Sequence, residues 1–195
     1  MSPVALPVLL LAASAVPLAE LGSRLPDAVV ELRYATADNF TGQVLYPPGA
    51  RCLLLPRTLE ALARAGAALR KQGYRLKLFD CYRPQSVQVA LWKAQPKPGY
   101  VMDPRKGSTH SRGTAVDLTL VDGKGREVPM PSPYDFFGAA AHQGYRGGPP
   151  GPRANRERLR AAMVAAGFKP NPYEWWHFEL EDAWTEPVRD EPVAR

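Results

Sequence analysis

The stretch STHSRGTAVDLTL, Ser108–Leu120, places one of the three histidines of the chain seven residues before an aspartate. Alternate residues in its second half are apolar, namely Val116, Leu118 and Leu120. This period of two predicts a strand with one buried face, and Asp117 then opens onto the other face. Gly113 permits a turn that brings His110 back to the same place. The stretch therefore predicts either a metal-binding His and Asp, or a hairpin with an incidental polar pair.

The first motif supplies two of the three nitrogen or oxygen ligands that a catalytic zinc site needs around an open position for water. The third ligand must be His142 or His177, because the chain has no other histidine. Glu174 precedes His177 by three residues in EWWHFEL, and an acid beside an activated water is what a general base requires. In a regular strand Glu174 and His177 would point to opposite faces, so the chain must bend near Trp175.

The rest of the chain predicts helices and further strands. Two segments with apolar residues at helical spacing each end near a glycine, residues 56–74 and 154–168. A shorter helix is predicted for QSVQVALWKA, residues 85–94. Strands are predicted, from alternation or aromatic content, at residues 74–84, 126–130 and 174–180. Together these elements favour a single α+β domain, with a central antiparallel sheet flanked by helices and the zinc site at the sheet.

Length and charge restrict the class of protein. A chain of 195 residues with 45% hydrophobic and 23% charged residues is typical of one globular domain, with or without a leader segment. Its net charge of +6 comes from scattered lysines and arginines, with no basic run and no motif that reads a nucleic-acid groove. We therefore expect a solvated basic surface and no nucleic-acid partner. The sequence makes no prediction of the oligomeric state.

The first 19 residues, MSPVALPVLLLAASAVPLA, carry no charged side chain and have a leucine-rich centre followed by small residues. This pattern predicts a signal peptide over residues 1–19 and a mature domain over residues 20–195, with Ala15 or Ala19 as the residue before the cut. Its prolines make it a poor membrane span, so we expect no stable span in the mature chain. We therefore expect an exported, periplasmic protein; the alternative is a cytoplasmic protein with a buried N-terminal segment.

Cys52 and Cys81 are the two cysteines of the chain. Cys52 precedes the first predicted helix and Cys81 ends the strand that follows it, so a bond between them would close one loop. Disulfides form in oxidising compartments, so a bonded pair agrees with export. We predict a disulfide; two isolated buried thiols are the alternative.

Four motifs resemble those of the zinc D-alanyl-D-alanine peptidases. STHSRGTAVD (108–117) resembles the family signature S-x-H-x-x-G-x-A-x-D, and EWWH (174–177) resembles the second signature of the dipeptidase branch, which includes the vancomycin-resistance dipeptidases. LRYATADNFTG (32–42) and FDCYRPQ (79–85) are also similar to that branch. The matches run in the family's order over residues 32–178, nearly all of the mature chain. The resemblance implies the α+β fold already predicted from the pattern of elements.

The resemblance also implies a metal centre and its base. One zinc ion per chain would be held by His110, Asp117 and His177, and Glu174 would be the general base. Arg83, in CYRP, would steady the substrate carbonyl and the developing oxyanion; the alternative is a surface cation at a strand end.

Further residues are implied as substrate contacts or as walls of the pocket. Ser108 would contact the substrate, or else stabilise the turn. Asp135 falls where the family has an acid that receives the ammonium group of the dipeptide, although the prolines around it depart from the family pattern. Tyr34 would bind substrate, and the same motif would contribute to the pocket wall through Tyr34, Asn39 and Phe40. Ordinary packing is the alternative for Tyr34 and Phe40. His142 would lie outside the ligand set, beside the ligands or at the surface.

The function implied is zinc-dependent hydrolysis of the free dipeptide D-alanyl-D-alanine, a small-molecule substrate from cell-wall metabolism. A murein D,D-carboxypeptidase or endopeptidase of the same fold is the first alternative, and it would need an open groove. A non-catalytic zinc-binding module is the second, which would have no need of a base at Glu174. Antibiotic resistance, wall turnover and nutrient scavenging all stay open as physiological roles.

Overall fold

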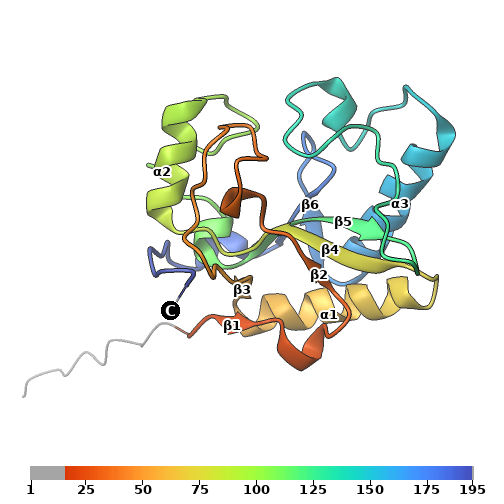
Figure 1. The fold of residues 1–195 in the computed structure, drawn as a ribbon, viewed down its shortest axis with the longest axis horizontal. Helices are drawn as coiled ribbons and strands as arrows, with labels where there is room; N and C mark the ends of the chain where they lie inside the picture. The colour runs from red at the N-terminus through yellow and green to blue at the C-terminus, as the bar shows by residue number, and fades with distance from the viewer. Residues whose placement is uncertain (1–15, 195) are drawn as a thin grey trace, which may run out of the picture.

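The stretch around Asp117 forms β5 (Ala115–Val121), the central strand of a five-stranded sheet in the computed structural model, which describes residues 16–194 (Figure 1). The strands lie in the order β2 (Val29–Val30), β4 (Arg75–Asp80), β5, β7 (His177–Leu180) and β6 (Phe168–Pro170). All seven residues of β5 are buried, because the strand has a partner on both edges and cover on both faces. The predicted α+β fold with a central sheet is confirmed.

The sheet is antiparallel except at one edge, where β2 pairs with β4 in parallel. The purely antiparallel prediction was wrong at this point. Between β2 and β4 the chain passes through a short strand and a long helix, and parallel neighbours require such a crossover connection.

Two helices cover one face of the sheet (Figure 1). α1 (Pro56–Arg70) and α3 (Pro150–Ala165) pack on each other, α1 also on β4 and α3 on β5 and β6. Their apolar stripes join the predicted apolar face of β5 in one core, which includes Leu59, Leu62, Leu69, Val116, Leu118, Leu120, Leu159 and Met163. α3 begins four residues earlier than predicted, because Pro150 suits the first turn of a helix.

The other face of the sheet lies under irregular segments, residues 31–50 and 126–148, and beside α2 (Gln85–Ala94). The strand predicted at residues 126–130 is not formed; Glu127 makes a single bridge to Val121. Pro129 has no N–H to continue the ladder, so the chain leaves the sheet there. The remaining short helices are η1 (Gly22–Arg24), η2 (Arg33–Ala35), η3 (His110–Arg112), η4 (Ala139–Ala141) and η5 (Ala183–Thr185).

A small second sheet and a disulfide secure the N-terminal part of the domain. β1 (Ala19–Glu20) pairs with β3 (Leu53–Leu54). Cys52 and Cys81 are bonded, as predicted, and connect the residue before β3 to the residue after β4. Residues 1–15 of the predicted signal peptide lie outside the described residues. Within residues 16–194, no helix has the length and apolar character needed to cross a membrane.

Candidate metal centre

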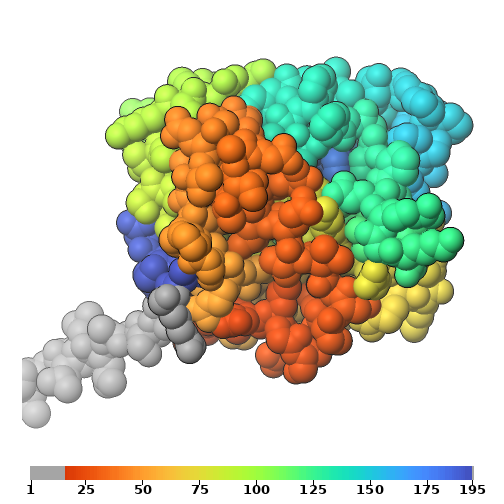
Figure 2. All heavy atoms as spheres, in the orientation of Figure 1, coloured from red at the N-terminus to blue at the C-terminus, as the bar shows by residue number. Residues whose placement is uncertain are grey.

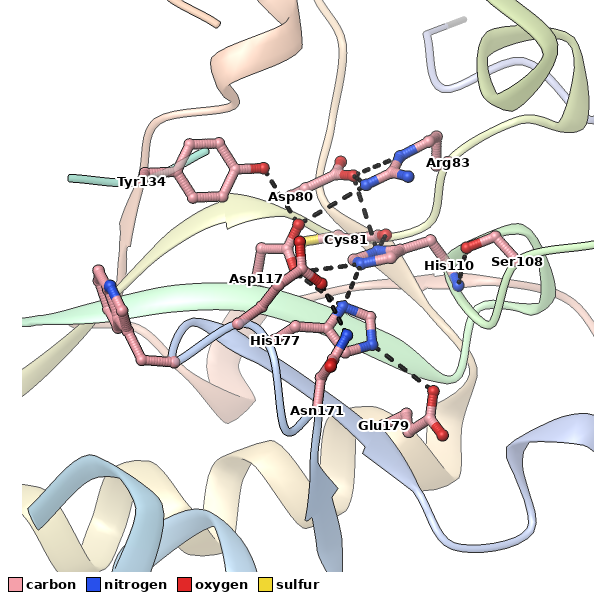
Figure 3. Close-up of polar contacts among 12 residues, drawn as sticks. Asp80, Cys81, Arg83, Ser108, His110, Asp117, Tyr134, Asn171, His177 and Glu179 are labelled. Atoms are coloured by element: carbon pink, nitrogen blue, oxygen red, sulfur yellow. Dashed lines mark hydrogen bonds and ion pairs between the residues drawn. The ribbon is translucent and has the colours of Figure 1, made fainter. Parts of the chain in front are cut away.

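Asp117 and His177 lie directly opposite each other on the paired strands β5 and β7. Opposite residues of an antiparallel pair project from the same face, and their side chains converge (Figure 3). His110 lies in η3, which ends at Gly113 with a left-handed φ of 72°. A Cβ at Gly113 would lie 2.7 Å from Leu18 Cδ2, so both conformation and space require glycine. This turn returns His110 to Asp117, as the sequence predicted.

The three predicted ligands form a compact, buried triangle. His110 Nε2 lies 3.2 Å from Asp117 Oδ1 and 3.1 Å from His177 Nδ1, and the latter two atoms are 3.0 Å apart. Ligand atoms at about 2.0–2.1 Å from a tetrahedral zinc ion are about 3.3 Å from each other, so the triangle fits such an ion. His142 is not part of it, because its Nε2 lies 2.8 Å from the hydroxyl of Tyr100.

Both histidines are oriented by acceptors behind them. The Nδ1–H of His110 donates to the carbonyl of Cys81 at 2.7 Å, which leaves the Nε2 lone pair facing the triangle. His177 Nε2 lies 3.5 Å from a carboxylate oxygen of Glu179. Burial raises the pKa of Glu179, but the hydrogen bond and charge of His177 outweigh burial and leave the pKa lowered. Such partners fix the tautomer and orientation of a ligating histidine.

The predicted bend at Trp175 is present. Residues 171–176 form turns before β7 begins, and the backbone N–H of His177 donates to the carbonyl of Glu174 at 3.3 Å. Glu174 therefore faces the same cavity as the ligands, which a continuous strand would not allow. Its Oε2 accepts a 2.7 Å hydrogen bond from Nδ2 of Asn171.

Glu174 is buried, and burial is the first cause of a pKa well above the ordinary value. The negative charges of Asp117 and Asp135 raise the pKa further, while the charge of His177 opposes them. Glu174 thus has the burial and position that suit proton transfer near neutral pH.

Arg83 is buried rather than a surface cation. Its Nε donates to Asp80 Oδ2 at 2.8 Å and its Nη1 to Gln88 Oε1 at 2.7 Å. Its Nη2 lies 3.6 Å from Asp117 Oδ2. A bulge at the end of β4 pairs Asp80 with Asp117, which places both carboxylates on the cavity face. The guanidinium is therefore held rigidly beside the ligands.

A cavity of about 350 Å³ contains the predicted site. Its lining includes every predicted site residue, namely Tyr34, Arg83, Ser108, His110, Asp117, Asp135, Glu174 and His177. Ser108 Oγ accepts from the backbone N–H of His110 at 3.2 Å, so it also stabilises the turn. Phe40 lines the cavity, whereas the amide of Asn39 bonds to its own loop, donating to the carbonyls of Thr36 and Gln43.

Asp135 combines backbone strain with an incompletely satisfied carboxylate. Its φ of 58° is left-handed, a conformation that Asp tolerates better than most residues but that still has a cost. Its Oδ2 accepts from the N–H of Phe40 at 3.4 Å. Burial, and next the charge of Asp117, raise its pKa to about 8. Within residues 16–194 no ion pair engages this carboxylate, so it is free to accept a cationic group.

A second cavity of about 680 Å³ adjoins the first across Phe40 and Asp135, which line both. It opens as a hollow between the orange N-terminal segment and the green to cyan segment that follows β5 (Figure 2). None of the three predicted ligands lines it, so the candidate metal centre belongs to the first cavity.

Several residues that shape the centre were not predicted, namely Asp80, Gln88, Tyr134, Asn171 and Glu179. Glu179 had a usable signal, because residues two apart on a strand share a face and it follows His177 by two. Asp80 ends β4 after a bulge that alternation does not reveal. The others contact the site from a helix or from loops, where no periodic pattern indicates the direction of a side chain.

Known proteins resemble this chain over most of its length. A family model described as D-ala-D-ala dipeptidase (Peptidase_M15) matches residues 12–192. D-alanyl-D-alanine dipeptidase of Escherichia coli K12 is 43% identical over 171 residues, which cover 88% of either chain. The enzymes of the same name from Enterococcus faecium and Streptomyces coelicolor are 34% and 35% identical, covering 84% of this chain and 93% and 92% of their own.

Proposed function

The chain belongs to the family described as D-ala-D-ala dipeptidase and is a metallopeptidase, and we propose that it hydrolyses free D-alanyl-D-alanine at a zinc ion held by His110, Asp117 and His177. One observation carries the proposal: two imidazoles and one carboxylate converge in a cavity that also contains a buried glutamate. This donor set is typical of a catalytic zinc ion with an open position.

Zinc, when bound, supplies a Lewis acid for the scissile carbonyl and lowers the pKa of a water molecule to about 7. Glu174 takes a proton from the attacking water and returns it to the leaving amine. Asn171 holds one carboxylate oxygen of Glu174, which leaves the other oxygen for this transfer. Arg83, kept rigid by Asp80 and Gln88, steadies the negative charge on the carbonyl oxygen, a contact typically worth about 3–4 kcal/mol.

The two ends of the dipeptide are assigned to different residues of the cavity lining. Asp135 receives the ammonium group, because it is half-buried and forms no ion pair within residues 16–194. Ser108 lines the same cavity and is assigned to the carboxylate end. Tyr34 forms part of the wall between them.

We also propose export to the periplasm, supported by the disulfide. Of the two predicted cleavage positions, the one after Ala15 suits the fold better. Ala19 of β1 pairs with Leu54 of β3, and the carbonyl of Val16 accepts a hydrogen bond from Nη2 of Arg189 at 2.6 Å. A cut after Ala19 would remove both interactions. Mass analysis of the N-terminus of the secreted protein tests this assignment.

The experiment for the main proposal uses the purified chain, freed of metal with a chelator and then supplied with zinc. We expect release of D-alanine from the free dipeptide after zinc is restored, and little release from a pentapeptide wall stem. Comparable release from the pentapeptide would favour the carboxypeptidase. Zinc binding without hydrolysis of either substrate would favour a non-catalytic module.

A further inference from the structure

The two oxygens of Asp117 have different surroundings. Oδ1 faces the nitrogens of His110 and His177 at 3.2 and 3.0 Å. Oδ2 points away from them and accepts a 3.0 Å hydrogen bond from the hydroxyl of Tyr134, with Nη2 of Arg83 at 3.6 Å (Figure 3). One oxygen is thus directed at the metal position and the other is already engaged.

Packing of the aromatic ring fixes the position of the Tyr134 hydroxyl. Its ring lies 4.8 Å from the ring of Phe79 and 5.3 Å from that of Trp176, measured between centroids. The loop that carries it is fixed by a 3.0 Å hydrogen bond from Nε1 of Trp175 to Oγ of Ser132. The hydroxyl of Tyr134 contacts Asp117, and Tyr134 also lines the second cavity.

An ionised carboxylate can only accept hydrogen bonds, so the proton of the Tyr134 hydroxyl points to Asp117. The hydroxyl of Tyr34, 3.4 Å away, then acts as the donor to Tyr134. Two tyrosines therefore form a short chain of hydrogen bonds that ends on the outer oxygen of a metal ligand.

We propose that Tyr134 is a positioning residue of the metal centre, which restricts Asp117 to binding through Oδ1 alone. The inference rests on the proposed zinc site. A carboxylate bound through both oxygens would take up a coordination position that the substrate or water requires. Tyr134 prevents this by occupying Oδ2 with a neutral donor, and it limits rotation of the carboxylate. Partners of this kind typically change metal affinity by about 10- to 100-fold when removed.

The test compares Tyr134→Phe with wild type as full chains. Phenylalanine keeps the ring packed on Phe79 and Trp176 and removes only the hydroxyl. The matched control is Tyr82→Phe, which removes the hydroxyl of a buried tyrosine that donates to the backbone carbonyl of Glu191 at 3.0 Å and is no part of the candidate metal centre. Zinc affinity is measured by competition with a coloured chelator, and thermal unfolding is measured on the metal-free proteins.

We expect Tyr134→Phe to weaken zinc binding by about 10- to 100-fold, whereas Tyr82→Phe should keep the zinc affinity of wild type. The stabilities of the two metal-free variants should be close to each other. With cobalt(II) in place of zinc, Tyr134→Phe should absorb more weakly in the visible range, because a second oxygen of Asp117 raises the coordination number. Wild-type zinc affinity and a wild-type cobalt spectrum in Tyr134→Phe would overturn the inference, whatever the change in stability. If wild type itself bound no zinc, the proposed function would fail first, and the inference with it.

Discussion

Acetylation of the amine of D-alanyl-D-alanine is the perturbation that most directly tests how the cavity recognises its substrate. Asp135 is half-buried, its one hydrogen bond within the described residues is the 3.4 Å contact from Phe40, and its pKa is raised to about 8. The free dipeptide brings an ammonium group to this carboxylate. The N-acetyl dipeptide brings a neutral amide and leaves Asp135 without a cation.

The magnitude follows from two terms. Removing one partner of a buried charge pair costs about 3–5 kcal/mol. A carboxyl group with a pKa of about 8 is mainly protonated at pH 7. Ionising it so that it pairs with the ammonium group costs about 1.4 kcal/mol, which is subtracted from the free energy of the charge pair. The difference of about 2–4 kcal/mol corresponds to a kcat/KM about 30- to 1000-fold higher for the free dipeptide than for the N-acetyl dipeptide.

The assay measures D-alanine release from both substrates by wild type and by Asp135→Asn. Asparagine tolerates the left-handed backbone of this position, so the fold should be retained. We expect Asp135→Asn to lose most of the activity on the free dipeptide and to bring the ratio of the two kcat/KM values close to one. Asp103→Asn is the matched control; this carboxylate lines the same cavity but is paired with Arg105, so the wild-type ratio should persist. Equal kcat/KM values for the two substrates in wild type would refute the reasoning and favour the carboxypeptidase.

Three further predictions concern the metal, the base and the disulfide. Glu174→Gln should retain zinc while kcat falls by about 10²- to 10⁴-fold, measured by metal analysis and D-alanine release; loss of the metal would make Glu174 a ligand. His177→Ala should lose zinc on dialysis and His142→Ala should keep it, and the reverse result would reassign the third ligand. Replacing Cys52 and Cys81 by alanine should lower the free energy of unfolding in urea by about 3–4 kcal/mol, since the bond spans 29 residues; unchanged stability would contradict this role of the disulfide.

The predictions from sequence were strongest where a short motif determines its own geometry. The alternation around Asp117 predicted both the strand and the face on which the carboxylate lies. Gly113 predicted the turn that returns His110. Even the bend at Trp175 followed from the requirement that Glu174 and His177 share one cavity. The strand and the turn follow from local sequence alone, whereas the bend follows from local sequence together with the predicted site.

The sequence was least informative where tertiary contacts decide. β2 has only two residues, and its partner strand β4 follows α1 in the chain. So short a segment shows no alternation of apolar residues, and the sequence therefore did not indicate a parallel edge. Tyr134 reaches Asp117 from a loop rich in proline, where no period indicates which way a side chain points. Asp80 faces the site because of a bulge in β4, which alternation does not reveal. Pro129 has no N–H to donate to a strand ladder, and this outweighs the pattern that predicts a return strand over residues 126–130.

The pairing of β5 with β7 also determines when the metal site can form during folding. Asp117 and His177 are 60 residues apart in the chain, and α3 lies between them, so the ligands meet only after a long loop has closed. Before that step the chain offers one histidine and one aspartate without a third ligand. Zinc should therefore bind after the rate-limiting step of folding and slow unfolding more than it speeds folding. The lifetime of the folded enzyme, more than the rate at which it forms, would then depend on the supply of zinc.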